Sequence, residues 1–217
     1  MLKKIVVMGA GGFGTEAMWI LEEMNKLESS ADCWDILGYV EDDVLKKHKV
    51  YYDYKTLGTP EEVEEDYAGQ DLWYFCAIGD NYTRAAVAER LDRLGWKAAT
   101  LIHPSVIMAR NIKIGQGSFV GAGSVICPNA MIGEHVLINV RVAIGHDSVM
   151  ESFSQACPGA QINGFCKIKY AAMIGSNASI LPGRTVGEGA TVGGNSQVLR
   201  SIKAGTTVNG VPALTIY

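Results

Sequence analysis

The sequence predicts two folded parts, an N-terminal α/β domain of Rossmann-like type and an all-β domain in the form of a parallel β-helix. Two observations carry this prediction. Residues 3–14 read as a short strand that runs directly into a glycine-rich turn, and from residue 102 an apolar residue recurs every six positions. We expect the first domain over residues 1–100, the β-helix over 101–209 and a C-terminal tail over 210–217.

The first domain opens with the order strand, glycine turn and helix. Residues 3–8 are mainly aliphatic, Gly9, Gly11 and Gly14 form the pattern G-x-G-x-x-G, and residues 15–26 are helix-like. Such glycines let the backbone approach a phosphate, while the helix N-terminus offers unpaired N–H groups to its charge. This part is too short for the two halves of a dinucleotide fold, so it predicts a site for one nucleotide. Alternatively, the glycines only pack the helix against the strand.

Two further strands are expected over residues 35–40 and 72–78, with a helix over 82–94 after the second. The carboxyl ends of parallel strands share one edge of a doubly wound sheet, and ligands bind there. The sequence therefore predicts a crevice for a nucleotide-linked substrate at this edge. Its expected residues are Gly11, Gly12, Phe13, Glu41, Asp42, Gly79 and Asn81.

The second domain follows from the six-residue period, which runs from Ile102 through Met108 to Ala204. Neither a helix nor a hairpin has this period. A hexapeptide repeat predicts a solenoid of very short strands, in which the recurring aliphatic side chain fills the interior and glycine or small residues turn the corners. Three hexads make one coil of 18 residues, so residues 18 apart lie above one another.

Charge and composition exclude some function classes. The net charge of −4 and a pI near 5.6 give no reason to expect nucleic acid or an anionic membrane surface as partner. The first apolar run is far shorter than the roughly 20 residues that span a bilayer, and we expect a cytoplasmic protein. The cysteines form no C-x-x-C pair and predict buried thiols, with neither disulfides nor a thiolate metal site. They are Cys33, Cys76, Cys127, Cys157 and Cys166.

Three histidines of the repeat fall at different phases of the coil. Counted from Ile102, His103 is at position 2, His135 at 16 and His146 at 9. Within one chain they do not converge on one metal ion, and we expect no metal, although histidines of neighbouring subunits could still meet. We expect His103 to be a structural turn residue and His135 to lie on the outside of a turn. Outside the repeat, His48 is expected in a surface loop and the acidic run 61–66 on a solvated helix face.

His146 is the strongest catalytic candidate. Asp147 follows it directly, and Gly164 lies 18 residues later at the same phase, which places it about 4.8 Å away on the next coil. Acyl transfer needs a base for the acceptor's proton, a carboxylate to orient that base and an N–H donor for the thioester oxyanion. The sequence therefore predicts an acyl-transfer site at these three residues.

At this point the chain resembles the sialic acid O-acetyltransferase and PglD-like group of bacterial sugar acyltransferases. The resemblance covers nearly the whole length. It rests on the glycine loop 9–14, Gly38-Tyr39-Val40-Glu41-Asp42-Asp43, Leu57-Gly58-Thr59, Ala77-Ile78-Gly79-Asp80-Asn81 with Arg84, His103-Pro104, residues 139–147, Pro158-Gly159-Ala160 and Gly210-Val211-Pro212-Ala213.

The resemblance implies a homotrimer of left-handed β-helices with acetyl-CoA as cosubstrate between neighbouring subunits. It implies that His146 is the general base, that Asp147 stands where the family has Glu or Asp, and that the Gly164 N–H faces the thioester oxygen. It also implies that Asn139 contacts the acceptor group, and that Glu41, Asp42 and the glycine loop hold a uridine nucleotide. The expected coenzyme contacts are Gln155, Gly164, Gly175, Ser176 and Pro182.

Three departures from the family pattern bear on substrate and coenzyme. Phe13 and Gln155 stand where amino-sugar members often carry histidine, and Leu214 replaces a lysine that is usual in the tail. We predict that the protein is an acetyl-CoA-dependent acetyltransferase that acts on an amino or hydroxyl group of a sugar, which is expected to be linked to a nucleotide, in surface-glycan synthesis. The alternatives are a hexapeptide acetyltransferase with an amino acid acceptor such as serine, and a non-enzymatic nucleotide-sugar-binding trimer.

Overall fold

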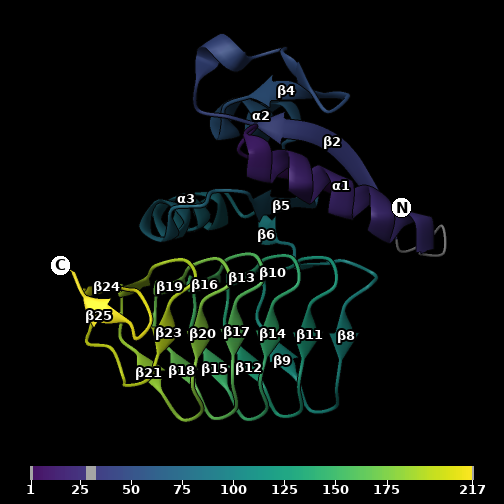
Figure 1. The fold of residues 1–217 in the computed structure, drawn as a ribbon. Helices are drawn as coiled ribbons and strands as arrows, with labels where there is room; N and C mark the ends of the chain where they lie inside the picture. The colour runs from purple at the N-terminus through teal and green to yellow at the C-terminus, as the bar shows by residue number, and fades with distance from the viewer. Residues whose placement is uncertain (1, 28–32, 217) are drawn as a thin grey trace. The chain divides into compact units, whose positions relative to one another are not determined.

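The computed structural model describes residues 2–27 and 33–216 of the 217-residue chain. These residues form two compact units, which meet in the sequence between Pro104 and Ser105. The first unit is α/β and the second consists of short strands in stacked coils (Figure 1).

The first unit is built around a sheet in the order β3-β4-β2-β1-β5-β6, which is parallel except for β3, the antiparallel partner of β4. β1 lies at its centre and pairs in parallel with β2 and β5. α1 packs on β1 and β2, α2 lies beside β4, and α3 packs on β5 and β6. The element bounds are β1 (Lys3–Met8), α1 (Gly12–Leu27), β2 (Trp34–Val40), the 3-10 helix η1 (Val44–Lys46), β3 (Val50–Tyr51), β4 (Tyr54–Gly58), α2 (Pro60–Asp66), β5 (Leu72–Cys76), α3 (Asn81–Arg93), β6 (Lys97–Ala98) and β7 (Leu101–Ile102).

The predicted order of elements in this unit is confirmed, with shifts at their ends. β1 has its expected bounds, whereas α1 begins at Gly12, three residues early, because the last two loop glycines form its first turn. β5 ends at Cys76, two residues before the expected end. The acidic run forms α2, which begins at Pro60 and is capped by Thr59 and Glu62 in a reciprocal capping box.

The second unit is a left-handed parallel β-helix with three faces. The first face is β10 (Phe119–Val120), β13 (Leu137–Ile138), β16 (Gln155–Ala156), β19 (Met173–Ile174), β22 (Thr191–Val192), β24 (Thr207–Asn209) and β25 (Leu214–Thr215). The second is β8 (Ile107–Met108), β11 (Val125–Ile126), β14 (Ala143–Ile144), β17 (Gln161–Ile162), β20 (Ser179–Ile180) and β23 (Gln197–Val198). The third is β9 (Lys113–Ile114), β12 (Met131–Ile132), β15 (Val149–Met150), β18 (Lys167–Ile168) and β21 (Thr185–Val186).

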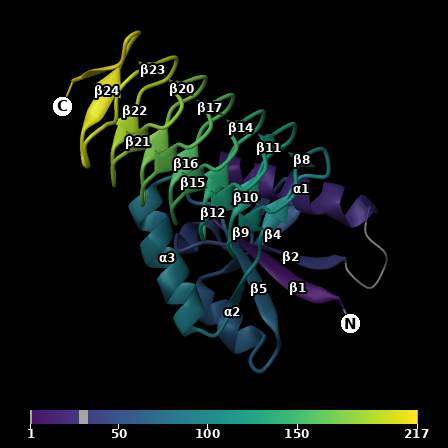
Figure 2. The ribbon, with the colours of Figure 1, turned by 90° about the horizontal axis from the view of Figure 1, so that it is seen from below.

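The 18-residue coil is confirmed by the register of these strands. Ile144 pairs with Ile126 on the preceding coil and Ile162 on the next, each 18 residues away, and Figure 2 shows the coils stacked in this order. The recurring aliphatic side chains fill the interior, where Ile138, Ile144 and others are fully buried. Small residues four positions later close the corners from inside: the buried Ser148 hydroxyl, for example, donates to the Asn163 carbonyl at 2.9 Å.

The two ends of the β-helix depart from the predicted period. Met108 is 45% exposed, because β8 is the edge strand of its face. At the other end Val186 pairs with Ile202, and Thr191 with Thr207, each 16 residues apart. The last coil is therefore two residues shorter, and Ala204 is exposed rather than interior. The tail folds back as β25, antiparallel to β24.

Candidate active site

His146 and Asp147 lie on the corner between β14 and β15. The His146 Nδ1 is 2.8 Å from Oδ2 of Asp147, and both side chains are exposed to solvent. A carboxylate only accepts hydrogen bonds, so in the neutral ring this contact places the proton on Nδ1 and leaves the lone pair on Nε2. The hydrogen bond from His146, and then one from Asn129, lower the pKa of the Asp147 carboxyl. The pair thus presents an oriented imidazole to solvent.

Gly164 lies directly above the imidazole on the next coil, as its phase predicts. A Cβ on this buried glycine would stand 2.6 Å from Nε2 of His146, so a side chain would displace the ring. Phe165 follows, with its ring edge-on to the imidazole at 4.9 Å between centroids and 60% of the residue exposed. The α-carbon of Gly164 and the side chain of Phe165 therefore both border the candidate base.

Two neighbours of this site were missed by sequence reasoning. Asn129 donates to Oδ1 of Asp147 at 3.1 Å, and the Phe165 ring makes a T-shaped contact with His146. Both occupy the same corner position as Asp147, one coil before and one coil after it. The 18-residue spacing was the signal that could have found them.

The remaining residues predicted in the β-helix fall on two corners. Pro182 is exposed on the corner of His146, two coils further along. Asn139, Gly175 and Ser176 lie on the corner between the first and second faces. The Asn139 side-chain oxygen accepts from the Val140 N–H at 2.8 Å.

Two of the residues predicted to contact the coenzyme, Gly175 and Gln155, make close contacts within the β-helix. A Cβ on Gly175 would stand 2.6 Å from backbone atoms of the following coil, so this glycine is required for packing. Gln155 starts β16, and its amide nitrogen points to the Cys157 sulfur at 3.7 Å.

In the first unit, the glycine loop is tightly packed at Gly14 and open at Gly11 and Gly12. A Cβ on Gly14 would collide with the carbonyl oxygen of Gly9, which shows that this glycine is needed where α1 meets the turn. A Cβ on Gly11 or Gly12 would meet no atom within 4 Å. Phe13 packs edge-on against Phe75, with centroids 5.9 Å apart. The packing explanation therefore applies to Gly14, whereas Gly11 and Gly12 leave their backbone accessible.

Glu41, Asp42 and Asn81 are already engaged at this edge. The Glu41 carboxylate accepts from the Ala10 N–H at 3.1 Å and from the Lys46 ammonium at 3.0 Å. Asp42 accepts from Arg90 at 2.8 Å, and Arg90 also forms two hydrogen bonds with Glu61.

Asn81 is buried, and its side-chain oxygen accepts from Arg84 at 2.8 Å. The fully buried Arg84 also donates to the Ile78 carbonyl at 2.9 Å. Arg84 and Asn81 therefore build the turn that carries the exposed Gly79.

The expectation for His135 was wrong, because this residue is buried at 3% exposure. Its ring stacks in parallel on Phe153, with centroids 5.0 Å apart, and lies over Gly117, where a Cβ would overlap it. Gly117, which has no side chain, leaves space for the imidazole on one coil, and the Phe153 ring covers it from the next coil. His103 packs against Trp19 at 5.0 Å, and His48 is exposed in a loop as predicted.

Cys76 and Cys166 are buried, and Cys33, Cys127 and Cys157 are half-buried. Burial raises the pKa of Cys76 to about 12 and also raises the pKa of Cys157 and Cys166. Among residues 2–27 and 33–216 no group of three His, Cys, Asp or Glu side chains could hold a metal ion. No helix in these ranges is long and apolar enough to cross a membrane.

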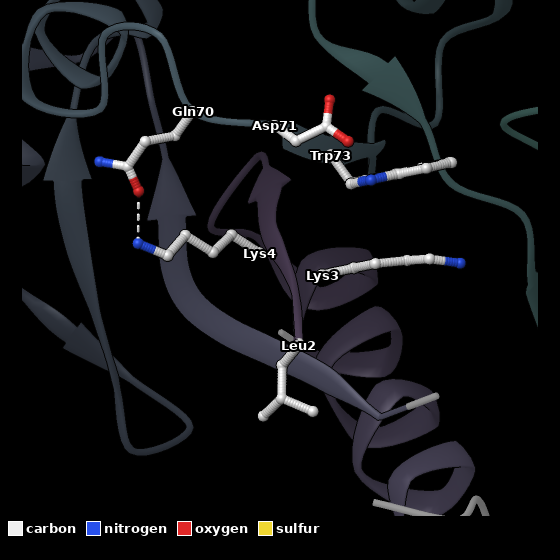
Figure 3. A pocket seen from close by; sticks show the side chains of 6 residues that line it. All are labelled: Leu2, Lys3, Lys4, Gln70, Asp71 and Trp73. Atoms are coloured by element: carbon white, nitrogen blue, oxygen red, sulfur yellow. Dashed lines mark hydrogen bonds between the residues drawn. The ribbon is translucent and has the colours of Figure 1, made fainter. Parts of the chain in front are cut away.

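A separate hollow lies at the opposite edge of the first unit's sheet, as Figure 3 shows. It has a volume of about 350 Å³ and is lined by residues at the beginnings of β1 and β5, among them Lys3, Lys4 and Trp73. The Lys4 ammonium donates to Gln70, and the Lys3 ammonium lies 5.3 Å from the centre of the Trp73 ring. This hollow is therefore distinct from the predicted crevice at the carboxyl edge.

The α/β unit and the left-handed β-helix with its His–Asp corner together define a two-part hexapeptide-repeat architecture. Residues 4–91 match the family model for the PglD N-terminal domain, which confirms the predicted resemblance. A curated relative, the UDP-N-acetylbacillosamine N-acetyltransferase of Bacillus subtilis, is 32% identical over 122 residues, 56% of this chain and 52% of that protein. The match thus spans about half the length of the curated relative.

Solved structures extend the similarity over the whole chain. The acetyltransferase domain of PglB from Neisseria gonorrhoeae, in complex with acetyl coenzyme A, is 27% identical with a TM-score of 0.87, and 100% of both chains is covered. PerB from Caulobacter crescentus, in complex with CoA and GDP-perosamine, has a TM-score of 0.88 at 24% identity and covers 100% of this chain and 99% of its own. At that identity PerB shows the shared fold alone.

Proposed function

We propose that the protein is an acetyl-CoA-dependent acetyltransferase that acts on an amino or hydroxyl group of a nucleotide-linked sugar, in surface-glycan synthesis. The observation that carries the proposal is the arrangement of His146 between Asp147 and Gly164. It supplies an oriented base with an open Nε2 and a backbone amide on the adjacent coil. These are the groups that direct acyl transfer from a thioester requires.

In the proposed reaction the acceptor attacks the thioester carbonyl as His146 Nε2 removes its proton. The negative charge that develops on the carbonyl oxygen is stabilised by the Gly164 N–H. The C–S bond then breaks, and the proton on His146 passes to the departing coenzyme A sulfur. Asp147 holds the ring and stabilises its charged form, so no covalent enzyme intermediate is needed.

The acceptor is proposed to bind with its nucleotide at the carboxyl edge of the first unit. Gly11 and Gly12 offer open backbone there, next to Phe13, and Gly79 is exposed. Glu41, Asp42 and Asn81 belong to the same proposed site, in which Glu41 and Asn81 act by shaping the loops they hold. The Bacillus subtilis relative is named as an N-acetyltransferase, which favours an amine acceptor.

The coenzyme is proposed to lie along the β-helix, in contact with Gln155, Gly164, Gly175, Ser176 and Pro182, with Asn139 facing the acceptor. We further propose a cytoplasmic homotrimer in which a neighbouring subunit covers the His146 corner. Two observations support it. Large apolar side chains are exposed on both sides of this corner. Ile107 and Val125 lie on the second face, Met131 on the third face and Phe165 on the corner itself. The third face also carries a hollow of about 580 Å³ over β9, β12 and β15.

The decisive experiment incubates the protein with acetyl-CoA and a panel of UDP-, dTDP- and GDP-linked amino sugars, and measures thiol release. Turnover with one of these sugars, absent in His146→Ala, is the expected result. Turnover with free serine but with no sugar would instead identify an amino acid acceptor. Failure to bind coenzyme A in calorimetry would support a nucleotide-sugar-binding trimer without catalysis.

A further inference from the structure

A column of amide side chains leads to the catalytic pair along the His146 corner. Asn111, Asn129 and Asp147 follow one another at 18-residue intervals and all adopt positive φ, at 61°, 63° and 57°. The Asn111 amide nitrogen donates to the Asn129 oxygen at 3.4 Å, and the Asn129 amide nitrogen donates to Oδ1 of Asp147 at 3.1 Å. Oδ2 of the same carboxylate contacts His146 at 2.8 Å.

The direction of this column follows from the chemistry of its end. The Asp147 carboxylate can only accept, so the Asn129 amide must turn its NH₂ group toward it. Its oxygen then faces the preceding coil, where the Asn111 NH₂ group provides a donor. Each carboxylate oxygen of Asp147 thereby has its own partner, which fixes the plane of the carboxylate as well as its position.

The backbone holds the two residues in place. The Asp147 N–H donates to the Pro128 carbonyl at 3.0 Å, so adjacent coils are bonded at this corner next to Asn129. Positive φ is a conformation that asparagine and aspartate adopt more readily than most residues. The geometry of the column is therefore set by the coil itself.

We propose that Asn129 is a positioning residue for the catalytic base, acting through Asp147. This inference rests on the proposed function of His146. By holding Oδ1, Asn129 keeps Oδ2 directed at Nδ1, and so keeps Nε2 aimed at the acceptor. The lowered pKa of Asp147, to which Asn129 contributes after His146, agrees with a donor that favours the ionised carboxylate.

Two substitutions separate a donor from a space-filling role. Asn129→Gly suits the positive φ but removes the amide, and Asn129→Asp keeps the shape but places a second carboxylate beside Asp147. If Asn129 donates, Asn129→Asp lowers kcat at least as strongly as Asn129→Gly, each by about threefold to tenfold, as expected for an exposed charge-assisted hydrogen bond. The KM for acetyl-CoA stays unchanged.

Asn195 provides the matched control, because it is exposed on another corner with φ of 57°. Asn195→Gly, which removes an exposed side chain and keeps the backbone hydrogen bond to Ser176, is expected to leave kcat unchanged. Full activity of Asn129→Asp together with loss in Asn129→Gly would show that the side chain only fills space, and would overturn the inference.

A second readout does not depend on turnover. In ¹³C NMR titrations, the pKa of the Asp147 carboxyl is expected to rise in Asn129→Gly and to stay unchanged in Asn195→Gly. An unchanged Asp147 titration in Asn129→Gly overturns the role of Asn129, even in an active enzyme. A wild-type protein without transferase activity would contradict the proposed function instead, while the titration would still report whether Asn129 acts on Asp147.

Discussion

The imidazole of His146 lies against the α-carbon of Gly164, so closely that one added methyl group on the glycine would stand 2.6 Å from Nε2. The base and the proposed oxyanion donor thus come from adjacent coils and are held together by the coil spacing. A substitution that moves one of these two groups is therefore expected to change its position relative to the other.

Gly164→Ala is expected to lower kcat by about 10²-fold. The new methyl group must push the imidazole away, and a misplacement of about 1 Å in a catalytic group has an effect of this size. Steady-state kinetics with the sugar acceptor would measure it, and thermal melting followed by circular dichroism would serve as the control for an intact fold. Near-normal kcat would show that the imidazole does not act from its present position.

His146→Ala is expected to lower turnover by about 10² to 10⁴-fold, the range of general-base catalysis, with coenzyme A binding nearly intact. Single-turnover measurement of thiol release would show whether the loss is in the chemical step. Retention of near-normal turnover would exclude His146 as the base.

Asp147→Asn tests the orientation of the base. An amide can donate to Nδ1, which would favour the tautomer with the proton on Nε2 and block the base, so kcat should fall by about 10²-fold or more. Because the native carboxyl has a lowered pKa, its contact with His146 is present above the ordinary aspartate range. It is lost only as pH falls through that lowered pKa. Activity of wild type and variant should therefore be compared between pH 6 and 8, where the native carboxylate is ionised, and near-normal kcat of the variant there would contradict the orienting role of Asp147.

The glycine loop offers a comparison of stability with binding. Gly14→Ala should lower the free energy of unfolding by about 1 to 3 kcal/mol, because its methyl group meets the Gly9 carbonyl. Gly12→Ala meets no atom and should leave the melting temperature unchanged. It should instead raise the KM for a nucleotide sugar if the open backbone binds phosphate. Denaturant melts and kinetics on both variants would distinguish the two roles, and equal stability losses would contradict this division.

The sequence predicted most of the fold because a six-residue period has one structural solution, and the 18-residue coil then placed Gly164 beside His146 correctly. It did not predict the shortened last coil, since Ala204 continues the apolar pattern even though Ile202 makes the pairing. His135 was misplaced because phase gives the corner of a residue, whereas its burial depends on Gly117 below and Phe153 above.

In the first unit, too, the sequence predicted the positions of site residues but not their side-chain contacts. The positions of Glu41 and Asn81 at the carboxyl edge follow from the strand order. Their partners do not, because the contacts of Glu41 with Ala10 and of Asn81 with Arg84 depend on side-chain directions that no spacing rule gives.

The column of corner residues also restricts how the length of this protein can change. Removing or adding a few residues between Asn129 and Gly164 would rotate every later corner relative to the earlier ones, and would carry His146 away from its vertical neighbours. Only whole turns of the solenoid, or bulges confined to a single corner, preserve that alignment. New acceptor preferences are therefore expected to arise by substitution along the corners, or by changes in the separate α/β unit, rather than by gradual lengthening of the coil.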